Sequence, residues 1–139
     1  SMQSKKIDNA TINTILEAIN FNENGLVPVI AQQYDTKEVL MLAWMNSESF
    51  KETLKTESVC YWSRSRKKLW RKGESSGQTQ QLKDLRWDCD SDTLLILVDQ
   101  TGVACHTGRR SCFYNAIREG KITSISNVEI DPKDLYGEG

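Results

Sequence analysis

The chain has 139 residues, with 18 basic and 19 acidic side chains and a formal net charge of −1. This length accommodates one domain and is too short for two ordinary ones. The balanced charge and a pI near 5.9 argue against a protein whose main work is coating nucleic acid or an anionic membrane. A hydrophobic fraction of 38% indicates a soluble globular protein, and no apolar run reaches the roughly 18–20 residues of a membrane span.

The N-terminus SMQSKKIDNA lacks the apolar stretch of a signal peptide, so we expect a cytoplasmic protein. Residues 1–10, in which Ser1 precedes Met2, are expected to be disordered or derived from an expression tag. Residues 11–130 are expected to form a single domain, followed by a polar C-terminal tail over residues 131–139.

Two helices and two strands are expected in the first part of the chain. Residues 11–20 carry the apolar spacing of a short amphipathic helix, at Ile12, Ile15, Leu16 and Ile19. Strands are expected over residues 27–34 and 39–45. Asn46 or Ser47 can then cap a helix that extends to about Thr56.

From residue 59 onward, short β-prone runs are separated by glycine or charged clusters. Strands are expected over residues 59–63, 81–87, 93–98, 103–107, 111–116 and 122–125. Early helices followed by many strands predict an α+β fold, with a predominantly antiparallel β-sheet and a few short helices.

The segment DCDSD, residues 88–92, is the densest chemical signal. In an extended chain Asp88, Asp90 and Asp92 would share one face, roughly 6.5 Å apart, while Cys89 would point to the other face. Three like charges at that spacing need an offsetting cation, and carboxylates suit Mg²⁺, Mn²⁺ or Ca²⁺, whereas the thiolate suits Zn²⁺. A solvated acidic turn is the alternative interpretation.

A second signal is the segment ACHTGRRSC, in which Cys105 and Cys112 flank Gly108. The two cysteines could return on adjacent strands of a hairpin, so that their sulfurs converge on one metal ion. With Cys89 they would supply the three protein ligands typical of a catalytic zinc. Two core cysteines on a hairpin would fit equally. His106, the only histidine, could bind metal, act as a general base, or simply form a hydrogen bond.

A third signal is the basic stretch YWSRSRKKLWRK, which places six of the 18 basic residues within nine positions. Arginine and lysine side chains suit phosphate, and tryptophan can stack on a base. The following GESSG adds small hydrogen-bonding groups. An anionic, base-containing small molecule fits this stretch, and so does single-stranded nucleic acid. A basic hairpin with its tryptophans in the core is the purely structural alternative.

Taken together, several segments resemble the monofunctional phosphoribosyl-AMP cyclohydrolases, enzymes of histidine biosynthesis. These segments are GLVPVIAQ, EVLMLAWMN, YWSRSRKKLWRKGESSGQ, DCDSD and GVACHTGRRSCF, in this order and spacing. The resemblance extends from about Gly25 to Phe113. Val29, Gln33 and Ser75 depart from the family pattern, and none of them is a candidate ligand.

The resemblance implies a hydrolase that opens the adenine ring of N1-(5-phosphoribosyl)-AMP at the N1–C6 bond. The product is the phosphoribosylformimino-aminoimidazole carboxamide ribonucleotide, in the third step of histidine biosynthesis. It also implies a homodimer whose zinc is held by Cys105 and Cys112 of one chain and Cys89 of its partner. A zinc-activated water would attack C6, with His106 as the catalytic base or proton shuttle.

The resemblance further implies a Mg²⁺ site at Asp88, Asp90 and Asp92 and places substrate binding in the basic stretch. Within that stretch, the candidates for the two phosphates are Arg64, Arg66 and Lys72, and those for polar contacts are Glu74 and Ser76. The expected partners are therefore the small-molecule substrate and a second copy of the chain, with no nucleic acid and no membrane.

The alternative function is a zinc-stabilised RNA-binding module that uses a basic hairpin over residues 62–72. It would predict salt-dependent nucleic-acid affinity and leaves the three aspartates unexplained. A zinc-dependent nucleobase deaminase fits less well, because the chain lacks the H-x-E and P-C-x-x-C elements of that chemistry.

Overall fold

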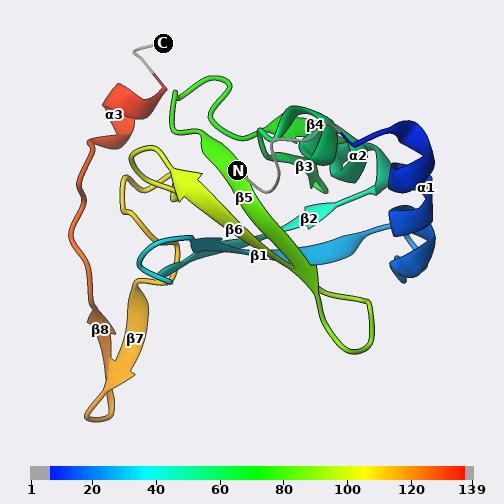
Figure 1. Cartoon of the computed structure of the whole chain (residues 1–139). Helices are drawn as coiled ribbons and strands as arrows, with labels where there is room; N and C mark the ends of the chain where they lie inside the picture. Colours follow the sequence, from blue (N-terminus) through cyan, green and yellow to red (C-terminus); the bar gives the residue numbers. More distant parts are fainter. Residues whose placement is uncertain (1–6, 137–139) are drawn as a thin grey trace.

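The computed structural model describes residues 7–136 (Figure 1). The expectations for the two ends of the chain fall partly on residues 1–6 and 137–139, which lie outside the described residues. No helix between residues 7 and 136 has the length and apolar character needed to cross a membrane.

A four-stranded sheet in the order β2-β1-β6-β5 forms the centre of the fold. Its strands are β1 (Val27–Gln33), β2 (Val39–Met45), β5 (Gln80–Trp87) and β6 (Leu94–Gln100). β1 pairs antiparallel with β2, and β5 pairs antiparallel with β6, whereas β1 and β6 are parallel. The predicted α+β class with a mostly antiparallel sheet is therefore confirmed, and the β1–β6 pair is its one parallel element among residues 7–136.

One face of this sheet is covered by helices and by a small hairpin (Figure 1). The covering elements are α1 (Asn9–Ala18), α2 (Ser47–Thr56), β3 (Cys60–Ser63) and β4 (Lys68–Arg71). Alternate residues of β1 are buried beneath them, together with Ile12 of α1 and Phe50 and Leu54 of α2. The β4 strand was not among the expected strands, although a hairpin in this stretch was one of the alternatives considered.

The start of α2 follows directly from its sequence. The Asn46 side chain accepts a hydrogen bond from the Ser49 amide at 2.8 Å, and the Ser49 hydroxyl accepts one from the Asn46 amide at 3.0 Å. This reciprocal capping satisfies two amides that the first turn leaves without helical partners. The predicted cap and helix end at Thr56 are confirmed.

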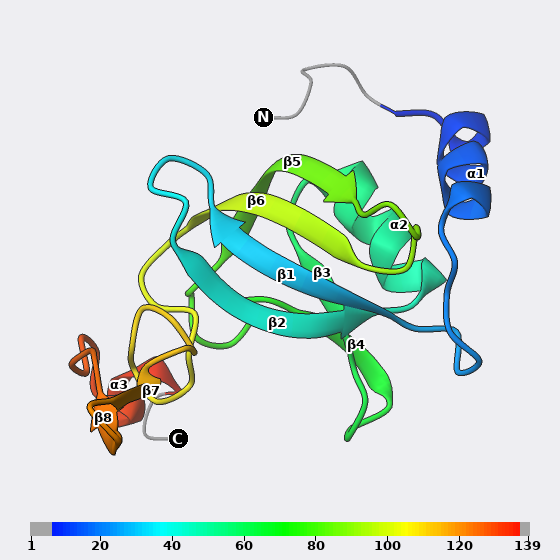
Figure 2. The same cartoon turned by 90° about the horizontal axis from the view of Figure 1, so that it is seen from below.

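No helix or strand within residues 7–136 covers the opposite face of the sheet, which Figure 2 shows from below. Strand register places apolar side chains side by side on this open face, because Ile30 pairs with Leu42 in β2 and with Leu95 in β6. The apolar residues of this face are Pro28, Ile30, Leu42, Trp44, Leu95 and Leu97. A sheet face of this composition is suited to being covered by another apolar surface.

Beyond β6 the chain departs from the predictions. The strand expected over residues 103–107 was wrong, and of the one expected over 111–116 only residues 115–116 are strand. Residues 101–114 form bends, turns and coil, and the next hairpin is β7 (Asn115–Arg118) and β8 (Lys121–Ser124). Gly108, which follows the first of these segments, has a φ of +87°, and a Cβ there would overlap the Ile130 carbonyl oxygen, so only glycine fits this close approach. A short helix, α3 (Pro132–Leu135), follows within the expected tail.

Candidate active site

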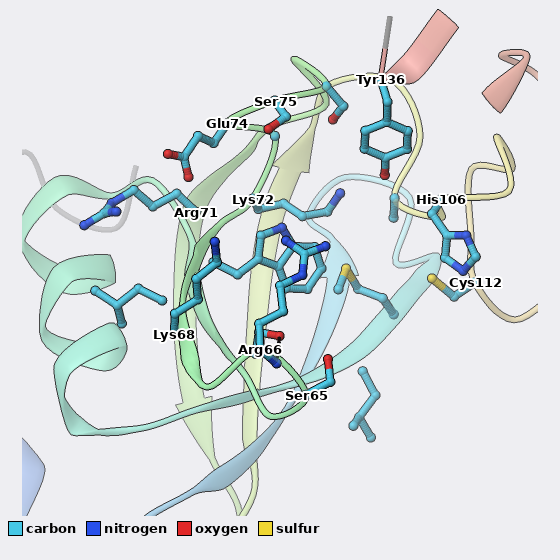
Figure 3. Close-up of a pocket in the computed structure, with 18 residues that line it drawn as sticks. Ser65, Arg66, Lys68, Arg71, Lys72, Glu74, Ser75, His106, Cys112 and Tyr136 are labelled. Atoms are coloured by element: carbon cyan, nitrogen blue, oxygen red, sulfur yellow. Dashed lines mark hydrogen bonds between the residues drawn. The ribbon is translucent and has the colours of Figure 1, made fainter. Parts of the chain in front are cut away.

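A cavity of about 910 Å³ opens between the β3–β4 hairpin and the loop that follows β6 (Figure 3). The hairpin and the turn after it supply a polar wall, and His106 and Cys112 lie on the opposite side. Met41 and Leu42 of β2 and Trp70 of β4 contribute apolar surface between the two walls. Two of the segments singled out from the sequence therefore meet at one cavity.

The polar wall contains four of the five predicted substrate-binding residues: Arg66, Lys72, Glu74 and Ser76. The fifth, Arg64, lines a neighbouring hollow of about 510 Å³, where its guanidinium lies 4.6 Å from the centre of the Trp44 ring. Lys68 and Arg71, which were not predicted as site residues, also line the main cavity. The charge of Arg71 is offset, because it forms a bidentate ion pair with Glu52 at 2.7 and 2.9 Å.

The turn after β4 holds this wall in place. Gly73 has a φ of +82°, and a Cβ there would lie 2.6 Å from the Gln78 carbonyl carbon. Only glycine allows the turn to fold back this tightly onto the start of β5. The Gly77 amide closes the turn by donating to the Gly73 carbonyl at 2.7 Å, which leaves Glu74 and Ser76 on the rim of the cavity.

Lys72 is the most buried cation of the site, with 9% of its surface exposed. Its ammonium lies 5.8 Å from the centre of the Trp70 ring and has no hydrogen-bond or ion-pair partner among residues 7–136. Burial lowers the pKa of Lys72, while negative charge on Cys112 and Cys105 opposes that shift. A desolvated cation without a counter-charge is suited to receive an anionic group of a ligand.

The two thiols of the loop after β6 lie together. Backbone hydrogen bonds from Ala104 to Arg110 at 2.9 Å and from Cys105 to Arg109 at 3.1 Å close the loop, and Cys112 donates to the Leu40 carbonyl at 2.7 Å. Burial, and then the adjacent Cys105 thiol, raise the pKa of Cys112 to about 12. The Cys105 thiol is buried and the Cys112 thiol is half-buried, and two such neighbouring sulfurs supply half of a tetrahedral donor set, so their chemistry fits a zinc ion.

His106 is exposed and lines the cavity beside Cys112 (Figure 3), whereas Cys105 is buried and does not line it. In the strand expected over residues 103–107, Cys105 and His106 would point to opposite faces, but this segment forms bends and a turn. The turn leaves the His106 side chain exposed and the Cys105 side chain buried. The imidazole is consequently free to reach a ligand while the Cys105 thiol stays buried.

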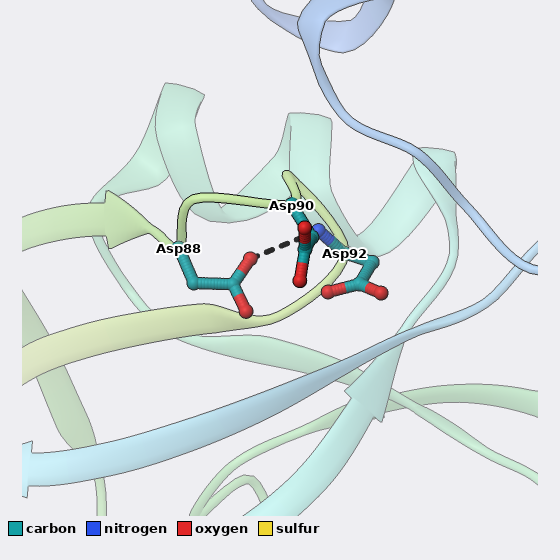
Figure 4. A group of neighbouring side chains, drawn as sticks. All are labelled: Asp88, Asp90 and Asp92. Carbon is teal, nitrogen blue, oxygen red and sulfur yellow. Dashed lines mark hydrogen bonds between the residues drawn. The ribbon is translucent and has the colours of Figure 1, made fainter.

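The DCDSD segment is a turn between β5 and β6, so the extended geometry predicted for it was wrong. Ser91 adopts a φ of +61°, and its amide donates to the Asp88 carbonyl at 3.0 Å. The turn nevertheless gathers the carboxylates: oxygens of Asp88, Asp90 and Asp92 all lie within 4.8 Å of one another (Figure 4). Their exposed oxygens fit a hard divalent cation.

Hydrogen bonds inside this turn favour an ionised carboxylate. The Asp88 Oδ1 accepts from the Asp92 amide at 3.1 Å and from the Thr93 amide at 3.3 Å. Desolvation raises the pKa of Asp88, but these hydrogen bonds together outweigh it and the net shift is downward. Cys89 is exposed at the tip of the same turn.

The cysteines predicted to share one metal are distant within a single chain. Cys89 precedes β6 and Cys105 follows it, and the seven residues of β6 span roughly 23 Å. Within residues 7–136, the three aspartates are the one group of at least three acidic, cysteine or histidine residues whose ligand atoms converge. A site that contains all three thiols therefore requires two chains.

Tyr136 is a cavity residue that was not predicted from the sequence. It follows α3, whose Leu135 is buried, and it lines the cavity near His106 (Figure 3). The sequence carries a signal for the helix that precedes Tyr136, because Asp131 before Pro132 is a typical helix start. In the structure the Asp131 side chain caps this helix by accepting from the Lys133 amide at 3.0 Å.

A cationic cavity with a half-buried thiol and a histidine on its opposite side is typical of an enzyme that acts on an anionic small molecule. The family model described as phosphoribosyl-AMP cyclohydrolase matches residues 41–114. A curated protein of that name from Rhodospirillum centenum is 61% identical over 130 residues, which cover 94% of this chain and 98% of the relative. Others are 62% identical in Magnetococcus marinus, covering 88% and 95%, and 64% in Rhodospirillum rubrum, covering 86% and 85%. The chain belongs to the phosphoribosyl-AMP cyclohydrolase family, an enzyme family of histidine biosynthesis.

Proposed function

We propose that this chain hydrolyses the N1–C6 bond of the adenine ring in N1-(5-phosphoribosyl)-AMP, the third step of histidine biosynthesis. One observation carries the proposal: a single cavity has cations on one wall and the Cys112 thiol with His106 on the other. Phosphates bound at the first wall would leave the purine ring directed toward the second. The water oxygen becomes the carboxamide oxygen, the N1–C6 bond breaks, and the exocyclic nitrogen remains on the product.

The thiol pair would hold a zinc ion, with Cys105 and Cys112 from one chain and Cys89 from a second copy. When bound, zinc would supply Lewis-acid activation of a water molecule by lowering its pKa toward neutrality. His106 would take the proton that this water loses as it attacks C6 and deliver a proton to N1 as the ring opens. The exposure of the His106 imidazole in the cavity supports this role.

The basic wall would bind the two phosphates of the substrate. Arg66, Lys68 and Lys72 line the cavity, and Arg64 would assist from the neighbouring hollow. Glu74 and Ser76 would contact the ribose hydroxyls or the base. The aspartates of the β5–β6 turn would hold Mg²⁺, whose charge would help retain a phosphorylated ligand.

We expect Lys72→Met to reduce kcat/KM by about 10–100-fold, mainly through KM. A charge-assisted hydrogen bond contributes roughly 1.5–3 kcal/mol, and methionine keeps most of the volume of the lysine stem. Steady-state kinetics with phosphoribosyl-AMP measures the effect. Lys121→Met on the exposed β8 strand makes the same change in charge and should leave kcat/KM unchanged. Unchanged kinetics in Lys72→Met would remove Lys72 from the phosphate site.

The homodimer would form through the open face of the sheet. In this dimer the open faces of the two sheets would face each other, related by a two-fold axis that lies between them and is perpendicular to β6. The β6 strands of the two copies would then stack and run in opposite directions. Each β5–β6 turn then lies over the loop after β6 of the other copy, at both ends of the interface. This arrangement covers the apolar side chains around Ile30 and Leu95 and would bring Cys89 to the other copy's thiol pair.

We expect Ile30→Lys to raise the dimer dissociation constant at least about 100-fold, because an unpaired buried charge costs roughly 3–5 kcal/mol. Sedimentation velocity across a concentration series measures this, with circular dichroism to verify folding. Ile122→Lys is the matched control, since Ile122 is 89% exposed on the β8 strand outside this face. A dimer that survives Ile30→Lys, or one lost in Ile122→Lys, would place the interface elsewhere.

The function itself is tested by turnover of phosphoribosyl-AMP with Mg²⁺, followed by the ultraviolet change on ring opening, before and after zinc removal. We expect turnover that disappears with zinc and returns when zinc is restored. No turnover from folded, zinc-loaded protein would contradict the proposal. Strongly salt-dependent RNA binding would then favour the alternative, a zinc-stabilised module that uses the hairpin of residues 62–72.

A further inference from the structure

A buried glutamine anchors the start of the loop that carries Cys105 and His106, in addition to the backbone hydrogen bonds that close the loop. Gln100, at the end of β6, is 4% exposed, and its Nε2 donates to the carbonyl oxygens of Thr101 at 2.8 Å and Val103 at 3.2 Å. These carbonyls lie in a segment without a strand partner, so the amide supplies the hydrogen bonds that a sheet would otherwise provide.

The hydrogen-bond chain continues from Gln100 to the opposite wall of the cavity. The Gln100 Oε1 accepts from the Gln80 Nε2 at 2.8 Å, and the Gln80 Oε1 accepts from the Tyr61 hydroxyl at 2.7 Å. Both Tyr61 and Gln80 are fully buried. The Tyr61 ring packs against Trp70 of β4, with 5.4 Å between ring centres. A continuous chain of donors thus extends from the β4 wall to the cysteine loop.

Each link in this chain requires an amide or a hydroxyl in one orientation. Tyr61 donates to Gln80, Gln80 donates to Gln100, and Gln100 donates to the loop carbonyls. A primary amide is the side chain that accepts at one atom and donates twice at the other. Buried polar groups are costly unless all are satisfied, and a fully satisfied network makes one arrangement much more stable than its alternatives.

We propose that Tyr61, Gln80 and Gln100 form a positioning relay that sets the place of Cys105 and His106 relative to the β4 wall. None of the three lines the cavity, so they would act through the loop. The predicted effect of the relay on turnover depends on the proposed function. Its effect on the loop itself can be measured separately.

The first test is Gln100→Glu, which keeps the size of the side chain but replaces the donating nitrogen by an oxygen. That oxygen would face two carbonyl oxygens, so the loop must shift. We expect kcat to fall about 10–100-fold, because displacements on the order of 1 Å cost this much in rate, while KM stays within about twofold. Amide hydrogen exchange of residues 101–106 should become faster. Gln81→Glu, the same change at an exposed neighbouring position of β5, should change neither quantity.

Tyr61→Phe provides a second test with a smaller risk to folding, since it removes one hydroxyl. We expect a smaller fall in kcat than in Gln100→Glu, together with faster amide exchange in the loop. The Tyr61 hydroxyl reaches the loop only through Gln80 and Gln100, so this effect would show that the relay transmits it. The double variant with Gln100→Glu should be no slower than Gln100→Glu alone, because coupled positions are not additive.

The outcomes separate the relay from the function. Wild-type kcat and exchange in Gln100→Glu, or fully additive losses in the double variant, would overturn the relay. If the wild-type protein shows no turnover, the proposed function fails, and the exchange rates of the two single variants alone decide the relay. If amide exchange in the loop is then faster in Gln100→Glu but unchanged in Tyr61→Phe, the relay is overturned.

Discussion

Cys105→Ser is expected to lose zinc and cyclohydrolase turnover together. Serine is nearly isosteric, so the loop keeps its backbone hydrogen bonds, but an alcohol is a poor zinc ligand where a thiolate is needed. Because the activation of water is worth several kcal/mol, the loss of kcat should be at least about 10³-fold. Metal analysis and steady-state kinetics on the same protein sample measure both quantities. Retained turnover without bound zinc would overturn the mechanism.

Two variants make this result specific. Cys60→Ser removes the other fully buried thiol, which lies in β3 away from the cavity, and should retain zinc and turnover. His106→Ala should retain zinc while kcat falls by about 10²–10⁴-fold, the usual contribution of a positioned proton acceptor. If His106→Ala releases the metal instead, His106 is a ligand and its proposed role is wrong.

The elements predicted correctly from the sequence are those whose signals are local. The α2 helix begins where Asn46 can cap it and keeps Phe50 and Leu54 on its buried side. β2 is an apolar run of strand length whose pairing with β1 needs only a short connection. The parallel pairing of β1 with β6 depends on segments more than 60 residues apart, and no local pattern specifies it.

The two chemical segments were placed in the wrong backbone conformation for the same reason. Both the DCDSD segment and residues 103–107 were treated as strands with alternating faces, yet both form bends and turns, and Ser91 in the first has a positive φ. A turn brings together side chains that a strand would space apart, so the three aspartates converge more closely than alternation predicts. The residue types identified the chemistry, whereas the turns decide the geometry.

The composition of the cavity wall was only partly predictable. A basic stretch indicates anion binding, but which cations face the cavity depends on the hairpin and on partners elsewhere. Arg71 is offset by Glu52, 19 residues earlier in the chain, and Arg64 lies over Trp44 outside the main cavity. Lys72, by contrast, lines the cavity and is buried without a partner among residues 7–136.

Mixing two inactive variants is expected to restore activity if the zinc site is shared between copies. Cys89→Ser and Cys105→Ser should each be inactive alone. In a mixed dimer, one site combines the intact Cys105 and Cys112 of the first chain with the intact Cys89 of the second, while the other site carries both defects. Random exchange makes half of the dimers mixed, each with one working site of two, so about one quarter of wild-type activity should return.

The amount recovered distinguishes the possible arrangements. A site built within one chain would show no recovery, because every chain in the mixture carries a defect. The roughly 23 Å spanned by β6 between Cys89 and Cys105 makes that arrangement incompatible with a single folded chain. Mixing Cys105→Ser with Cys112→Ser is the control, since both ligands come from the same chain and no combination of the two rebuilds a site. Recovery in that control would mean that the thiol pair is itself divided between copies.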